Sequence, residues 1–157
     1  MKKIIKWALL ALVVLFGLLQ FTNPDRTNPP IMPEHDLFTL NPPPPEVAAL
    51  LRTSCFDCHS QATRWPWYSR VAPMSWLVAG DVRDGRAKLN FSDWPVNDPA
   101  RAGRKFGNIS DIVDAGDMPP KKYTMIHRDA VLTDAQRKTI IDWAEAQAAR
   151  VKAGAPK

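Results

Sequence analysis

The 157-residue chain is predicted to be all-α, with one helical domain preceded by an N-terminal transmembrane helix. Three observations support this fold class. Apolar residues recur at three- and four-residue intervals in the C-terminal half of the chain, as they do on one face of a helix. Residues typical of helix starts and stops border these stretches. No stretch alternates apolar and polar residues in the manner of a half-buried strand.

Residues 1–22 indicate a membrane anchor. Three lysines among the first six residues precede an uncharged run, 7–19. Counted from Ile4, with Lys6 reaching back to the headgroups, the apolar segment has 18 residues, which is at the short end for crossing a bilayer. A cleaved signal peptide also fits a 13-residue apolar core, but no small-residue cleavage site follows it. We expect an uncleaved single-pass anchor in the inner membrane, with its N-terminus in the cytoplasm.

Residues 23–45 are predicted to form a proline-rich linker. Eight prolines occur among the 22 residues from Pro24 to Pro45. Such a composition gives a semi-rigid, extended chain that can hold a domain away from a membrane. The second half also carries apolar residues that a spacer does not need, so we expect it to dock as a strap. These residues are Ile31, Met32, Leu37, Phe38 and Leu40.

Four helices are expected in the domain that follows, residues 46–157. They are Val47–Arg52, Pro73–Lys88, Asp98–Ala115 and a last helix that begins after Thr133. Pro45 suits the first turn of the first helix, and Gly116 is a good stop for the third. Thr133 and Gln136 form a capping box in front of the last helix. Its apolar stripe consists of Ile140, Ile141, Trp143, Ala144 and Ala148.

The segment Cys55-Phe56-Asp57-Cys58-His59 is a C-x-x-C-H motif, the attachment site of c-type haem. Two thiols three residues apart can each add to one vinyl group of the porphyrin. The imidazole that follows can then bind the iron from the proximal side. Cys55 and Cys58 are the only cysteines of the chain, so no other thiol competes for these roles.

Two other interpretations of the motif stay open. A dithiol redox pair or a disulfide also uses C-x-x-C, but in thioredoxin-like proteins it lies near a βαβ pattern, which this chain lacks. A zinc site needs further ligands at tetrahedral reach. Only His35 and His127 are available besides His59, and they form no compact histidine pair. The motif therefore favours one haem c bound through Cys55 and Cys58.

The sixth ligand of the iron would decide what such a protein does. Met118 is the favoured candidate, because it follows a helix stop and precedes two prolines, which give a fixed loop. An axial methionine raises the reduction potential and closes the iron, which suits electron transfer. His127 is the alternative, and an open site is the third option. We expect the metal ligands to be His59 and Met118, or His59 and His127.

Aromatic residues after the motif are expected to form the cofactor cavity. Trp65 and Trp67 flank Pro66 six to eight residues after His59 and can line a haem with their indole rings. The second nitrogen of a proximal histidine needs an acceptor, for which we expect the backbone carbonyl of Pro66 or Pro73. Arg52 or Arg64 could bond a haem propionate.

The net charge of +5 does not indicate nucleic-acid binding. Three of the 21 Lys and Arg residues lie in the anchor, which leaves 18 basic residues against 16 Asp and Glu, or +2. No basic stripe is visible in that remainder, and two haem propionates would roughly cancel its charge.

The chain resembles the bacterial haem-binding domain family over roughly residues 35–147. The stretches that carry the resemblance are Cys55–Ser60, Thr63–Tyr68, Ala72–Trp76, Leu89–Ser92, Asp117–Tyr123, His127, Leu132–Thr133 and Trp143. The resemblance implies a small helical domain similar to class I cytochromes c, with one covalent haem. By position it implies thioether links at Cys55 and Cys58, His59 as proximal ligand and Met118 as distal ligand.

We therefore expect a membrane-anchored periplasmic monohaem cytochrome c that carries single electrons. Its expected partners are redox proteins or a membrane respiratory complex, and no nucleic acid. We expect no enzymatic activity. The alternatives are a haem-containing subunit, a gas or redox sensor, and a peroxidase-like enzyme with an open sixth site on the iron.

Overall fold

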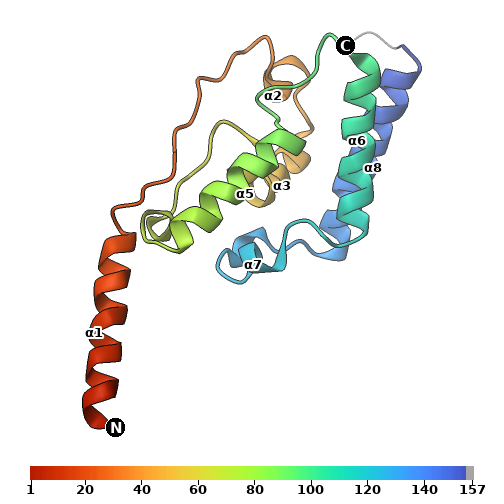
Figure 1. Ribbon diagram of the computed structural model, residues 1–157. Coiled ribbons are helices and arrows are strands. Elements are labelled where there is room, and N and C mark those ends of the chain that lie inside the picture. The colour runs from red at the N-terminus through yellow and green to blue at the C-terminus, as the bar shows by residue number, and fades with distance from the viewer. Residues whose placement is uncertain (155–157) are drawn as a thin grey trace.

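The computed structural model describes residues 1–154, which form helices and contain no strand (Figure 1). The all-α prediction is confirmed for these residues. The helices are α1 Lys2–Leu19, α2 Leu37–Leu40, α3 Pro45–Ser54, α4 Phe56–His59, α5 Met74–Lys88, α6 Pro99–Asp114, α7 Lys121–Thr124 and α8 Asp134–Lys152, with 3₁₀ turns at Trp67–Arg70 and Arg128–Ala130. Each of the four helices expected in the domain is present, as α3, α5, α6 and α8, and only their ends differ from the prediction.

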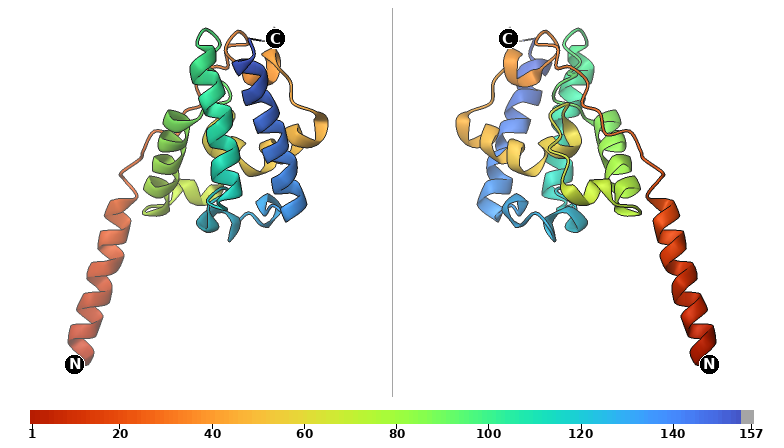
Figure 2. Two further views of the ribbon diagram at one scale, coloured as in Figure 1. Left: turned by 90° about the vertical axis from the view of Figure 1, so that its right-hand side faces the viewer. Right: turned by 90° about the vertical axis from the view of Figure 1, so that its left-hand side faces the viewer.

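Helix α1 extends away from the rest of the protein, and none of its side chains is buried (Figures 1 and 2). It has 18 residues, three of which are lysines near its start. None of the helices between residues 1 and 154 is both long and apolar enough to cross a membrane. A helix was predicted here and is present, but its description as a transmembrane span is not supported by the structure.

The segment after α1 is docked on the loop that leads into α5. The Gln20 amide donates to the carbonyl of Ala72 at 3.3 Å and accepts from its backbone N–H at 2.9 Å. Further along, the Asn28 amide donates to the carbonyl of Thr63 at 2.9 Å. The sequence predicted docking of the second half of the linker alone. The Asn28 bond shows that its first half is also held, through a polar side chain rather than an apolar one.

The second half of the linker packs against the core through Leu37 and Phe38. The other three residues expected to dock, Ile31, Met32 and Leu40, are exposed, so this prediction is confirmed only in part. Asp36 caps α2 by accepting a hydrogen bond from the Thr39 backbone N–H at 2.8 Å. Leu37 is buried, and the ring of Phe38 meets the ring of Phe56 edge-on, with 4.7 Å between centroids. The strap therefore contacts the C-x-x-C-H segment directly.

Helices α6 and α8 lie side by side and form the longest packed pair of the domain (Figures 1 and 2). Asp98 caps α6, and Thr133 and Gln136 form the predicted capping box of α8. The apolar faces of the two helices are buried against each other and the core. Their buried apolar residues are Ala102, Phe106, Ile109, Val113, Ile140, Trp143 and Ala144.

A series of aromatic rings connects the C-x-x-C-H segment to this pair of helices. Phe56 stacks on Phe91 at 5.5 Å, and Phe91 stacks on Trp94 at 6.5 Å. Trp94 then meets Phe106 of α6 at 4.7 Å, and Phe106 meets Trp143 of α8 at 5.5 Å. Because these rings are buried, they fix the motif relative to α6 and α8 through the apolar core.

Candidate cofactor site

The C-x-x-C-H motif forms one helical turn. Helix α3 ends at Ser54, Cys55 follows it, and α4 covers Phe56–His59. The carbonyl of Cys55 accepts from the backbone N–H of Cys58 at 3.2 Å and from that of His59 at 2.9 Å. Residues three and four apart share one face of such a turn. Cys55, Cys58 and His59 therefore lie on one side, and both cysteines are free thiols.

Both cysteines are half-buried, and their surroundings disfavour the thiolate. Burial raises the pKa of the Cys55 thiol to about 12 and that of the Cys58 thiol to about 11. The neighbouring carboxylates of Asp81 and Asp57 also contribute to the raised pKa of Cys58. Reactive dithiols of the redox type have a lowered cysteine pKa instead. This environment therefore does not resemble that of a thiol–disulfide exchange site.

The ring of His59 is fixed by two backbone carbonyls. Its Nδ1 lies 3.0 Å from the carbonyl oxygen of Gly85 and 3.0 Å from that of Leu89. Because both partners are acceptors, Nδ1 carries the proton and Nε2 holds the free lone pair. The prediction that the carbonyl of Pro66 or Pro73 accepts this hydrogen bond is wrong. The ring is buried against the end of α5, which sequence reasoning did not place near the motif.

The environment of His59 keeps the imidazole neutral. Burial, as the largest cause, and the positive charges of Lys88 and Lys105 lower its pKa below the ordinary value, against the opposing effect of its two hydrogen bonds. A neutral imidazole with a protonated Nδ1 is the form that binds a metal through Nε2. The chemistry and tautomer of His59 therefore suit an iron ligand.

A mainly apolar pocket of about 150 Å³ lies beside Cys58. One face of α5 contributes Met74, Leu77, Val78 and Val82 to its lining. The opposite side includes Tyr68, Tyr123, Ile126 and His127. Several of these side chains are exposed at its rim, and Leu77 and Ile126 are each more than half exposed. An apolar surface of this kind next to a thiol suits a large apolar group attached at that thiol.

Asp57, inside the motif, connects it to the segments around this pocket. Its Oδ1 accepts from the backbone N–H of Arg64 at 3.1 Å, and the Arg64 guanidinium pairs with the same carboxylate at 3.3 Å. Its Oδ2 accepts from the hydroxyl of Tyr123 at 2.8 Å. Burial and the bond to Asp57 raise the pKa of that phenol well above its ordinary value. Sequence reasoning did not identify Asp57 or Tyr123, because their contact depends on the tertiary fold.

The two candidates for the sixth ligand lie in different places. His127 lines the pocket beside Cys58, where its Nε2 lies 2.6 Å from the hydroxyl of Tyr68 and its ring stacks on Tyr123 at 4.2 Å. Met118 is half-buried in the loop between α6 and α7, and its carbonyl accepts from Arg137 at 3.2 Å. Met118 is not among the residues that line the pocket. Both assignments stay predictions.

The other residues expected around the cofactor have partners of their own. The Trp65 indole donates to the side chain of Asn28 at 3.2 Å, and Trp67 is 76% exposed. Pro66, between them, lines the pocket, whereas the two tryptophans do not. The guanidinium of Arg52 lies over the rings of Phe38 and Phe56, at 4.9 Å and 5.0 Å from their centroids. The roles of Trp65 and Trp67 as cofactor contacts stay predictions.

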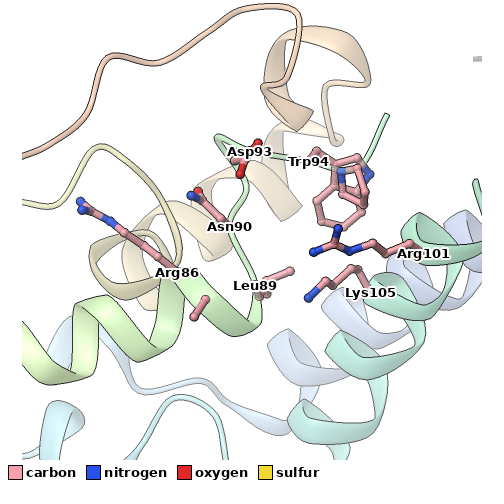
Figure 3. Close-up of a pocket in the computed structure, with 9 residues that line it drawn as sticks. Arg86, Leu89, Asn90, Asp93, Trp94, Arg101 and Lys105 are labelled. Atoms are coloured by element: carbon pink, nitrogen blue, oxygen red, sulfur yellow. The ribbon is translucent and has the colours of Figure 1, made fainter. Parts of the chain in front are cut away.

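A second pocket, of about 190 Å³, lies between the end of α5, the segment around Trp94 and helix α6 (Figure 3). Arg101 and Lys105 extend from α6 toward Leu89, whereas Arg86 points away from them. Lys105 also donates to the carbonyl of Lys88. This pocket is polar, and one of its cations, Lys105, contributes to the lowered pKa of His59. Among residues 1–154, no group of three or more His, Cys, Asp or Glu side chains could hold a metal ion by itself.

An all-helical domain with two thiols and a neutral, oriented imidazole on one turn has the donor set of a haem-binding protein. The comparison with protein families agrees, because the model of the haem-binding domain family matches residues 14–146, more than four-fifths of the chain. The chain therefore belongs to the haem-binding domain family. No curated protein and no solved structure matches it significantly.

Proposed function

We propose that this protein is a monohaem c-type cytochrome that carries single electrons. The observation that supports the proposal best is the state of His59, whose Nδ1 proton is held by two carbonyls at 3.0 Å while Nε2 keeps its lone pair. Cys55 and Cys58 would hold the porphyrin through thioether bonds, and His59 would bind its iron. When bound, haem supplies an iron centre that exchanges one electron at a time.

The residues of the chain have three tasks in this proposal. The carbonyls of Gly85 and Leu89 orient the imidazole and increase its basicity. The apolar side chains of α5 and the segment around Ile126 cover the porphyrin and exclude water. The positive charges of Lys88 and Lys105 act on His59. They favour the reduced state of an iron bound there, because the oxidised iron carries one more positive charge, which they repel. The cytochrome c-like architecture is part of this proposal.

The visible spectrum of the full chain tests this function. The protein would be produced together with a haem-attachment system, and spectra would be recorded oxidised, reduced, and reduced with carbon monoxide. A closed electron carrier gives sharp low-spin reduced bands that do not respond to carbon monoxide. A high-spin spectrum that shifts on gas binding would contradict electron carriage by a six-coordinate iron.

One observation favours a second candidate function, a haem that binds a small ligand for sensing or peroxidase-like chemistry. His127, Tyr68 and Arg64 all line the pocket beside Cys58, so the pocket offers polar groups that could contact an iron-bound ligand. Arg64 is already paired with Asp57, however, and His127 with Tyr68. We rank this function second for that reason, and carbon monoxide binding by the wild-type protein would reverse the order.

We also propose that the haem domain acts in the periplasm, attached to the inner membrane through the N-terminal segment. Support comes from the three lysines that precede the apolar run of α1, and from the exposure of its apolar side chains as far as Leu18. Redox proteins or a membrane respiratory complex would then be its partners. A reporter enzyme that is active only outside the cytoplasm, fused behind the C-terminus, tests the location. Reporter activity together with recovery in the membrane fraction is expected, and an inactive fusion would contradict the topology.

A further inference from the structure

We propose that the last turn of α5 is the platform that positions His59 for iron, and that Gly85 is the residue that permits this contact. The inference rests on the proposed function and adds a positioning residue to it. It concerns a residue 26 positions from the histidine, outside the C-x-x-C-H motif.

The first step is the hydrogen bonding at the end of α5. A helix leaves its last carbonyl groups without partners from the helix itself. The carbonyl of Gly85 accepts from the backbone N–H of Leu89 at 2.8 Å and from His59 Nδ1 at 3.0 Å. The carbonyl of Leu89, which follows the helix, accepts from the same nitrogen at 3.0 Å. The histidine therefore depends on the exact position of this helix end.

The second step is the distance between α5 and the motif. A Cβ atom placed on Gly85 would lie 2.5 Å from the carbonyl oxygen of Cys58, and 3.1 Å from both its carbonyl carbon and its Cβ. A contact of 2.5 Å is too short for any real Cβ. The obstacle is the backbone of the motif itself, so it cannot rotate away as a flexible side chain could. Any side chain at position 85 would push α5 and the motif apart.

The third step is the clamp next to Gly85. The guanidinium of Arg86 donates to the carbonyl of Ser60 at 2.8 Å through Nε and to the hydroxyl of Thr63 at 2.9 Å through Nη2. The end of α5 thus contacts the motif at three places. These are the backbone of Cys58, the ring of His59, and the residues that follow His59, Ser60 and Thr63. If a side chain at position 85 pushed α5 away from Cys58, the bonds of Arg86 to Ser60 and Thr63 would still hold the helix end to the chain after His59. The displacement would therefore fall mainly on the hydrogen bonds of His59.

Helix α5 provides a matched control for the test. Gly80 lies in the same helix, and a Cβ atom placed there would meet no atom within 4 Å. Gly80→Ala and Gly85→Ala therefore make the same chemical change and raise the helix propensity of α5 equally. Only Gly85→Ala introduces a clash with the motif, so a difference between the two variants reports on that contact.

The experiment compares the full-length wild type and both variants, produced with a haem-attachment system. Haem bound per chain, the reduced spectrum and the reduction potential are measured. For Gly85→Ala we expect roughly a 10-fold loss of haem per chain, the scale of effects seen when outer-shell partners of metal ligands are lost. The haem that remains should have a raised potential, because a weaker Nδ1–H bond makes the imidazole less basic. Gly80→Ala should match the wild type, and equal behaviour of both variants would overturn the proposal.

A second measurement decides the proposal if Gly85→Ala does not fold. Nitrogen-15 NMR of the haem-free, full-length wild type should show His59 as the neutral Nδ1–H tautomer, with a proton that exchanges slowly with water. The Nε2–H tautomer, or rapid exchange, would overturn the proposed platform. This readout does not involve haem. A wild type that acquires no covalent haem but shows the protected Nδ1–H would contradict the proposed function and leave the platform in place.

Discussion

His59 and His127 illustrate two ways in which this domain holds an imidazole. His59 is 9% exposed, and two backbone carbonyls at 3.0 Å hold its Nδ1. His127 is half-buried between α7 and α8, and side chains hold it, through the hydroxyl of Tyr68 at 2.6 Å and the stacked ring of Tyr123 at 4.2 Å. A backbone-held ring is fixed as long as the fold is intact, whereas a side-chain-held ring can be released by one local change.

Under the proposed function, the proximal side of the iron would be built into the fold, whereas the side that His127 could occupy would be adaptable. A ligand that must stay on the iron benefits from the first arrangement, since its orientation costs little further entropy. A residue that can exchange with another ligand benefits from the second. The following predictions test this contrast, and they run from the largest expected effect to the smallest.

Replacement of both motif cysteines should have the largest effect. In Cys55→Ser/Cys58→Ser we expect complete loss of haem that survives denaturation, because no other thiol exists in the chain. Haem staining after a denaturing gel measures this loss. Each single variant should keep part of the signal, since one thioether bond remains. Covalent haem in the double variant would show that the motif is not the attachment site.

Separate replacement of Met118 and His127 by Ala tests the adaptable side. If Met118 is the sixth ligand, its loss should lower the reduction potential by a sizeable part of the ~0.8 V range that axial ligands span, and should open the iron to carbon monoxide. His127→Ala should then leave the reduced spectrum unchanged. The reverse pattern would assign the sixth position to His127. If neither variant changes the spectrum, the iron is open or bound by another residue.

A core variant separates effects on the fold from effects on the ligands. Phe106 is 2% exposed and lies between Trp94 and Trp143. Phe106→Ala should lower the free energy of unfolding by about 3–5 kcal/mol, through lost burial and the cavity that remains. Chemical denaturation of the haem-free and haem-bound proteins measures this change. Below its unfolding transition the variant should keep the wild-type spectrum, and a changed axial ligand would show that fold and ligand are not separable.

The half-buried thiols should react slowly in the folded, haem-free protein, because their thiolate forms are disfavoured. With the Cys58 pKa raised from 9.0 to about 11, the thiolate fraction at pH 8 falls about 100-fold. Alkylation at pH 8 should be slower by that factor than in urea, and should accelerate as the pH rises toward 11. The folded state keeps a proton in this range that the unfolded state loses, so stability should fall as the pH rises. Equally fast alkylation with and without urea would show that the motif is not shielded.

The parts of the fold that were predicted from the sequence carry strong local signals. Helix α6 was expected over Asp98–Ala115 and covers Pro99–Asp114, and α8 begins directly after Thr133, the N-cap of the predicted capping box. Both helices could be predicted because their amphipathic spacing and their capping residues lie within or directly beside the helices themselves. The short helices α2, α4 and α7 were not predicted, because four residues are too few to show a period.

The partners of His59 could not be predicted because they are contacts between distant segments. Gly85 and Leu89 lie 26 and 30 residues further along the chain, in a helix whose sequence gives no sign of contact with the motif. Gly85 could be recognised as unusual, since glycine in the interior of a helix is unfavourable and calls for a reason. Gly80 is also a glycine inside this helix, but it has no close contact with the motif, so the sequence alone does not distinguish the two glycines.

Peptide mapping of the wild-type protein tests the central claim most directly. Trypsin cleaves after Arg52 and Arg64, and the peptide between them, residues 53–64, contains both cysteines and His59. After production with a haem-attachment system and digestion, mass spectrometry should find this peptide heavier by one haem, with no thiol left to alkylate. The same peptide without haem, with two alkylated cysteines or a disulfide, would contradict the assignment of the protein as a c-type cytochrome.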